Sequence, residues 1–150
     1  MKTVISAERV IDAPPDVVYH CIADYREHHR PSGFLPPAFS NMTITRGGVG
    51  AGTEASWQVT TGGRTQTISA VISEPDPGHV LVETARGLVT TFTVEPAERG
   101  ARIRFETVID EGGLSGLMTR LFAPRLLRPL YADEQKRLED YARAHGPASS

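Results

Sequence analysis

Hydrophobic and polar residues alternate along most of the first 110 positions, which is the pattern of strands that are buried on one face. Turns rich in glycine and proline separate the alternating runs, with Gly62-Gly63 placed as a tight hairpin turn. The predicted strands cover residues 3–11, 42–46, 53–60, 64–73, 79–84, 88–95 and 102–109. This series of short strands predicts an antiparallel sheet of six to seven strands.

A short helix is predicted directly after the first strand. Pro14 and Pro15 pre-set helical backbone where no N–H donor is needed, and Asp16 favours the positive end of a helix. Residues 24–30 predict a second short helix, which Pro31 and Gly33 would end.

After Gly112-Gly113 the hydrophobic period changes from two residues to about 3.6, which predicts one long C-terminal helix. Pro124 and Pro129 interrupt this apolar face. Because proline removes a helical hydrogen bond, a kink or a non-helical joint is expected there.

The composition fits a single domain over residues 1–150, with 39% hydrophobic and 23% charged residues. A net charge of −2 and the lack of a basic face argue against nucleic-acid binding. No window approaches the roughly 18 apolar residues of a membrane span, so stable membrane insertion is not expected. The single cysteine, Cys21, has no disulfide partner in the chain and fits a reducing cytoplasm.

Five segments carry a resemblance to a known group of proteins. They are residues 11–19 (IDAPPDVVY), 23–25 (ADY), 50–53 (GAGT) with Trp57, 74–77 (EPDP) and 100–103 (GARI). With the order of strand, two short helices, six strands and long helix, the chain resembles the helix-grip (SRPBCC) superfamily of START lipid-binding domains, birch-pollen-allergen proteins and the polyketide cyclase/dehydrase family. The resemblance covers residues 3–144 and departs at Pro124 and Pro129.

The resemblance implies an α+β helix-grip fold, in which a curved antiparallel sheet wraps around the long C-terminal helix. One helix cannot fill such a sheet, so an apolar cavity is expected unless large side chains plug it. Residues 34–39 form an unusually apolar loop, which is either a lid over the cavity or packing at the sheet edge. The candidate ligand-binding residues are Trp57, Val59, Ile68, Val82, Phe92, Phe105, Leu117, Met118, Leu121, Phe122, Phe34 and Phe39. For each of them, plain core packing is the competing interpretation.

Acid–base chemistry has four candidate residues, and their inward orientation is open: His28, His29, Glu83 and Arg86. The two histidines equally fit a solvated helix end. No two histidines or carboxylates fall at metal-ligand spacing on a common predicted helix face, and the glycine run at 47–52 does not open a helix. No metal and no cofactor are therefore expected.

Three functions remain open. The first is a monomeric or weakly dimeric protein that binds a small hydrophobic molecule such as a lipid, a polyketide or an aromatic metabolite. The second is a cyclase or dehydratase, a lyase- or isomerase-like enzyme without metal, that acts on such a ligand. The third is a protein-interaction domain. It would need an exposed apolar patch on the outer face of the sheet, but that face is rich in charged residues.

Overall fold

The computed structural model describes residues 2–110 and 113–145, and the side chains of residues 113–122 lie outside this description. Seven strands and two helices make up the described chain. The strands are β1 (Lys2–Ile11), β2 (Phe39–Arg46), β3 (Glu54–Thr61), β4 (Arg64–Asp76), β5 (Val80–Ala85), β6 (Leu88–Pro96) and β7 (Ala101–Asp110). The helices are α1 (Pro15–Ala23) and α2 (Gly113–His145).

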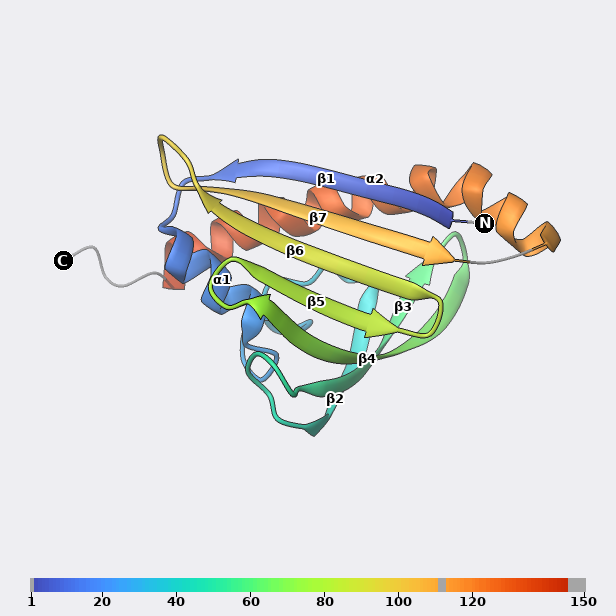
Figure 1. Ribbon diagram of the computed structural model, residues 1–150, viewed down its shortest axis with the longest axis horizontal. Helices are drawn as coiled ribbons and strands as arrows, with labels where there is room; N and C mark the ends of the chain where they lie inside the picture. The colour runs from blue at the N-terminus through green and yellow to red at the C-terminus, as the bar shows by residue number, and fades with distance from the viewer. Residues whose placement is uncertain (1, 111–112, 146–150) are drawn as a thin grey trace.

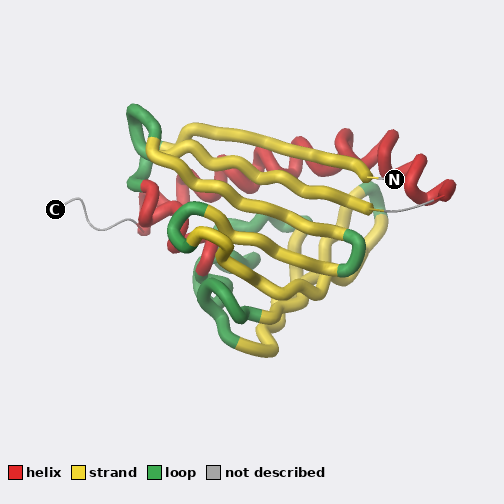
Figure 2. The backbone as a smooth tube through the Cα atoms, viewed as in Figure 1, coloured by secondary structure: helices red, strands yellow, loops and turns green. Residues whose placement is uncertain are grey.

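All seven strands belong to one antiparallel sheet in the order β1-β7-β6-β5-β4-β3-β2. Figure 1 shows α2 running along β1 behind the sheet, and Figure 2 separates the strand layer from the helices that cover its inner face. The sheet curves so that β2 and β3 turn away from the plane of β5 to β7 (Figure 2). The α+β helix-grip fold expected from the sequence is confirmed.

The C-terminal half of α2 is anchored on β1. Leu138 and Ala142 in this half of the helix are fully buried. Gln135 Nε2 donates a hydrogen bond to the backbone oxygen of Ala7 at 2.8 Å, and Arg9 forms an ion pair with Glu139 at 2.7 Å. Because these polar contacts fix the helix along the edge strand, the rest of α2 is held over the hollow face of the sheet.

The second short helix expected at residues 24–30 is a run of turns instead. Asp24 Oδ1 accepts hydrogen bonds from the backbone N–H groups of Arg26 and Glu27, at 2.9 and 3.0 Å. The backbone N–H of Tyr25 donates to Gly48 O rather than to a helical partner. These side-chain and long-range bonds replace the helical ladder, which explains the wrong prediction.

The helix α2 continues through Pro124 and Pro129, so the non-helical joint expected there is absent. Each proline lacks the backbone N–H that a helical hydrogen bond needs. Among the described residues, no helix combines the length and the apolar character needed to cross a bilayer.

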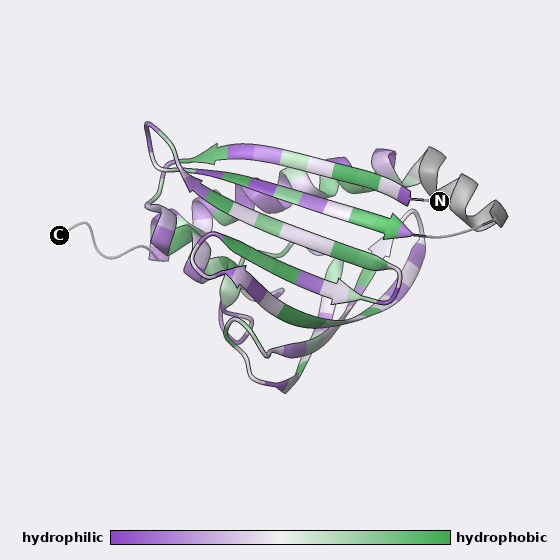
Figure 3. Cartoon of the chain, viewed as in Figure 1, coloured by the Kyte–Doolittle hydropathy of each residue, from purple (hydrophilic) through white to green (hydrophobic). Residues whose placement is uncertain are grey.

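Hydrophobic and hydrophilic residues alternate along the strands, as the coloured bands in Figure 3 show. In β7 the buried residues Ile103, Phe105 and Thr107 alternate with more exposed neighbours. In β5 the buried residues are Leu81 and Glu83. Val82 therefore lies on the outer face, which corrects its expected place in the cavity.

Candidate ligand-binding cavity

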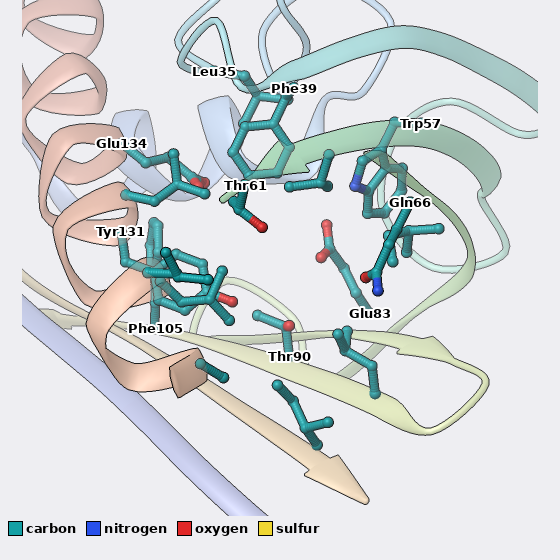
Figure 4. A pocket seen from close by; sticks show the side chains of 18 of the residues that line it. Leu35, Phe39, Trp57, Thr61, Gln66, Glu83, Thr90, Phe105, Tyr131 and Glu134 are labelled. Carbon is teal, nitrogen blue, oxygen red and sulfur yellow. The ribbon is translucent and has the colours of Figure 1, made fainter. Parts of the chain in front are cut away.

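A cavity of about 760 Å³ lies between the hollow face of the sheet, α2 and the segment that follows α1. Figure 4 shows side chains from these three parts converging on a common space. The lining residues are His29, Leu35, Phe39, Met42, Trp57, Val59, Thr61, Arg64, Gln66, Thr67, Ile68, Glu83, Arg86, Leu88, Thr90, Phe92, Phe105, Ile109, Ala123, Leu126, Leu127, Leu130, Tyr131 and Glu134.

Aromatic side chains form much of the apolar wall. Phe92 on β6 and Phe105 on β7 are almost fully buried and pack edge to face, with ring centroids 4.7 Å apart. Trp57 on β3 lies on another part of the wall and is the only tryptophan of the chain. Such surfaces bind apolar ligand groups without orienting them, so orientation depends on the few polar residues.

Glu83 is the central polar residue of the cavity. It projects from β5 into the interior (Figure 4) and is only 6% exposed. The hydroxyl of Tyr25 donates a hydrogen bond to Glu83 Oε2 at 2.5 Å. Burial raises the pKa of this carboxyl group from 4.5 to about 7, although the Tyr25 hydrogen bond acts in the opposite direction. Glu83 is thus close to half ionised at neutral pH.

His29 lies beside this carboxyl group. Its Nδ1 is 2.7 Å from the backbone oxygen of Ile22, which can only accept, so Nδ1 carries the hydrogen. In the neutral ring Nε2 therefore keeps its lone pair, and it lies 3.7 Å from Glu83 Oε2. Burial lowers the pKa of His29 to about 4, which keeps the ring neutral at pH 7.

Tyr25 holds the two groups together. Its ring stacks on His29 with centroids 4.4 Å apart, while its hydroxyl binds Glu83. The separation of 3.7 Å between His29 and Glu83 exceeds a direct hydrogen bond. A polar ligand atom can therefore contact both side chains. Glu83 would donate or accept a hydrogen bond there, and His29 would accept one through Nε2.

The opposite wall carries a second polar group on α2. The hydroxyl of Tyr131 is 2.6 Å from Thr107 Oγ1, which is 2.9 Å from Thr90 Oγ1. Burial raises the pKa of Tyr131, so its hydroxyl stays protonated. Burial also raises the pKa of Glu134 well above its usual range, with the nearby Glu83 adding to the effect. A neutral carboxylic acid is thus expected at Glu134.

The exposed lining residues cluster at one end of the cavity. Arg64, Gln66 and Thr67 begin β4, Arg86 lies in the turn between β5 and β6, and Leu126 faces them from α2. The cavity therefore opens between these elements. Residues 34–39 were expected to form either a lid or packing at the sheet edge. Leu35 and Phe39 line the cavity, and Phe34 and Leu35 are buried.

The family model described as "Polyketide cyclase / dehydrase and lipid transport" matches residues 2–143. The protein belongs to this family. A search of curated protein sequences finds no match.

Solved structures similar to this family member share its fold over almost the whole chain. The solution structure of KanY protein has a TM-score of 0.81 and 28% identity, covering 95% of this chain and 99% of that one. Zhui aromatase/cyclase, from a Streptomyces species, has a TM-score of 0.76 and 13% identity, with 100% and 99% covered. The di-domain aromatase/cyclase StfQ of the steffimycin biosynthetic pathway has a TM-score of 0.77 and 14% identity, covering 96% of this chain and 52% of that one.

The structure brings many of the residues proposed from the sequence to one cavity. Those that line it are Trp57, Val59, Ile68, Phe92, Phe105, Phe39, His29, Glu83 and Arg86. Phe34 does not line the cavity but packs against the His29 ring, with centroids 4.9 Å apart. His28 faces the opposite side and contacts the Tyr141 hydroxyl at 2.7 Å. The side chains of Leu117, Met118, Leu121 and Phe122 lie outside the described residues.

Sequence reasoning missed Tyr25, Tyr131 and Glu134. The sequence predicts a helix over residues 24–30, and no local pattern in it indicates that Tyr25 contacts β5. Tyr131 and Glu134 are separated by three positions in α2, and helical spacing places such residues on one face. That signal was available, but it does not show whether the shared face is buried.

Replacing Glu83 by glutamine tests the environment of the carboxyl group. The raised pKa means that the folded protein binds the Glu83 proton more tightly than the unfolded chain does, so this group lowers stability as pH rises from about 4.5 to about 7. Glu83→Gln keeps an acceptor for Tyr25 and removes the ionisation. Its free energy of unfolding relative to wild type should rise across this pH window, by up to about 3 kcal/mol above pH 7.

Urea denaturation at a series of pH values from 4 to 8 measures this difference. Glu54→Gln, at a partly exposed glutamate outside the cavity, is the matched control. If the difference in the free energy of unfolding between Glu83→Gln and wild type stays constant over this pH range, the pKa of Glu83 is not raised by burial.

Proposed function

We propose that this protein binds a small, largely apolar molecule that carries a carbonyl or hydroxyl group. The observation that carries the proposal is the cavity of about 760 Å³, with aromatic and aliphatic walls and a few convergent polar groups. Pockets for small organic ligands typically measure roughly 300–1,000 Å³ and have this composition. Glu83, His29 and Tyr131 would orient the oxygen function of the ligand.

The family description, which names polyketide cyclases, dehydrases and lipid transport, supports ligands of this class. The protein-interaction alternative has less support. The large hydrophobic residues that are exposed in the described chain are spread over four parts of the fold: Val4 and Val10 on β1, Val49 in a turn, Val71 on β4 and Leu126 on α2. A cytoplasmic location and a monomeric or weakly dimeric state stay predictions from the sequence.

A cavity-blocking substitution tests the binding proposal. Thr61 lines the cavity and points into it, whereas the adjacent Thr60 is exposed on the other face of β3. Thr61→Phe should weaken the binding of the apolar probe 1-anilinonaphthalene-8-sulfonate about tenfold or more, because the added ring fills the shared space. Thr60→Phe should bind like wild type.

Probe fluorescence excited through Trp57 reports occupancy of the same cavity. Equal probe affinity in Thr61→Phe, Thr60→Phe and wild type would place the binding elsewhere and overturn the proposal. Native mass spectrometry of the purified protein adds the mass of any small molecule that co-purifies.

A second candidate function is acid–base catalysis on the bound molecule, and the Tyr25–Glu83–His29 cluster specifically favours it. With a pKa of about 7, Glu83 is available both as a base and as an acid at neutral pH. On a β-hydroxy ketone, ionised Glu83 would take the proton next to the carbonyl group while Tyr131 donates a hydrogen bond to the carbonyl oxygen.

The electrons of the broken C–H bond then form a C=C bond, and the C–O bond of the β-hydroxyl breaks. Protonated Glu83 returns its proton to that departing oxygen, so one water molecule leaves and the carboxylate is regenerated. Neutral His29 would accept a hydrogen bond from the hydroxyl group through Nε2 and hold it near Glu83. The step is a dehydration that needs no oxidant and no cofactor.

Turnover of 4-hydroxy-4-phenylbutan-2-one to its unsaturated ketone, followed by ultraviolet absorbance, tests this chemistry. Wild type should accelerate the dehydration, and Glu83→Gln should lower kcat by roughly 10²-fold or more because it cannot exchange the proton. The Glu54→Gln variant should retain the wild-type rate. A wild-type rate no higher than that of Glu83→Gln would leave the protein as a binding protein only.

A further inference from the structure

A cluster of side chains that can ligate a metal lies outside the cavity, with His20 exposed, His28 partly buried and Asp24 buried. His20 is in the last turn of α1, Asp24 ends that helix, and His28 lies in the following turns. One ligating atom from each residue lies within 4.8 Å of the other two. Asp24 Oδ2 is 3.6 Å from His20 Nε2 and 3.9 Å from His28 Nε2. The sequence expectation concerned pairs of histidines or carboxylates on a common helix face, and it did not cover this cluster, because Asp24 and His28 lie beyond the last residue of α1.

Neighbouring groups orient two of the three candidate ligands. Asp24 Oδ1 is held by the backbone N–H groups of Arg26 and Glu27, which leaves Oδ2 facing the histidines. His28 Nδ1 lies 2.7 Å from the Tyr141 hydroxyl. This contact orients the His28 ring, and its Nε2 faces Asp24 Oδ2 at 3.9 Å. Hydrogen bonds of this kind commonly orient metal ligands.

A third histidine approaches the cluster from the end of α2. The rings of His145 and His28 have centroids 6.0 Å apart. His145 Nδ1 is 3.0 Å from the backbone oxygen of Tyr141, which fixes Nε2 as its free nitrogen. His145, His20 and His28 line a common shallow hollow of about 240 Å³.

We propose that His20, Asp24 and His28 form a binding site for a divalent transition-metal ion such as Zn²⁺, with His145 as a fourth ligand. Imidazole nitrogens with one carboxylate favour Zn²⁺, Co²⁺, Ni²⁺ or Cu²⁺ over Mg²⁺ and Ca²⁺. Tetrahedral zinc bonds of about 2.0–2.1 Å put ligand atoms roughly 3.3 Å apart. The two distances to Asp24 Oδ2 would have to contract by about 0.3 and 0.6 Å. The two histidines, whose ligating atoms lie within 4.8 Å of each other, can approach because the side chain of His20 is 60% exposed and free to turn.

The site is independent of the ligand cavity. His28 faces this surface cluster and its neighbour His29 faces the interior, so a bound metal would not contact Glu83. It would instead join the end of α1 to the end of α2. Because Asp24 and His28 lie in the same turns as Tyr25 and His29, a bound ion would also stabilise the turns that position those two residues.

Isothermal titration of Zn²⁺ into the full chain, without an affinity tag and after chelator treatment, measures the site. Wild type should bind one equivalent with micromolar or tighter affinity. His20→Ala and Asp24→Asn should each weaken binding at least tenfold, and His145→Ala by a smaller factor. An excess of Mg²⁺ should not compete. With Co²⁺ as the probe, intensified visible absorption would report tetrahedral coordination.

His79→Ala is the matched control, because His79 pairs with Asp76 at 3.3 Å on the surface without a second histidine ligand. This variant should bind Zn²⁺ like wild type. The proposal is overturned if wild type binds no Zn²⁺, if His20→Ala retains full affinity, or if His79→Ala loses as much affinity as His20→Ala. His20 is largely exposed, so its replacement leaves the fold intact, and circular dichroism verifies this.

Discussion

The hydrogen bond between Tyr25 and Glu83 is the constraint on which the proposed chemistry depends. It joins the turns after α1 to β5, two segments 58 residues apart, across the interior of the sheet. Burying a carboxyl group costs free energy unless the group is protonated or hydrogen-bonded. Glu83 has a raised pKa, which favours protonation, and it also accepts a hydrogen bond from Tyr25. The result is a proton-exchanging group inside an apolar cavity, with its neighbour His29 held neutral.

The position of this pair follows from the way the backbone turns after α1. Asp24 caps the backbone N–H groups that follow it, so the chain leaves the helical path and directs Tyr25 and His29 inward. The register of β5 directs Glu83 toward them, because Leu81 and Glu83 share the inner face. The anchoring of α2 on β1 through Gln135 completes the enclosure, since it holds Tyr131 and Glu134 over the same space.

The sequence predicted the fold better than the site. Alternation in β7 and the helical period after Gly113 are strong signals, because each reflects many buried positions. β5, with the sequence VLVETA, alternates poorly, since Val80 and Val82 on the outer face are as apolar as Leu81 within. The prediction therefore assigned Val82 to the cavity and left the orientation of Glu83 open. The adjacent His28 and His29 face opposite sides, which depends on long-range contacts with Tyr141 and Ile22 that local patterns do not encode.

The proposed chemistry requires that Glu83 retains its proton to near neutral pH in the folded protein. Carbon-13 NMR of the Glu83 side-chain carboxyl, assigned by comparison with the Glu83→Gln variant and titrated in the native state, measures this directly. A titration midpoint near pH 7 is expected for this resonance. A midpoint near 4.5, the ordinary value for a solvated glutamate, would contradict it.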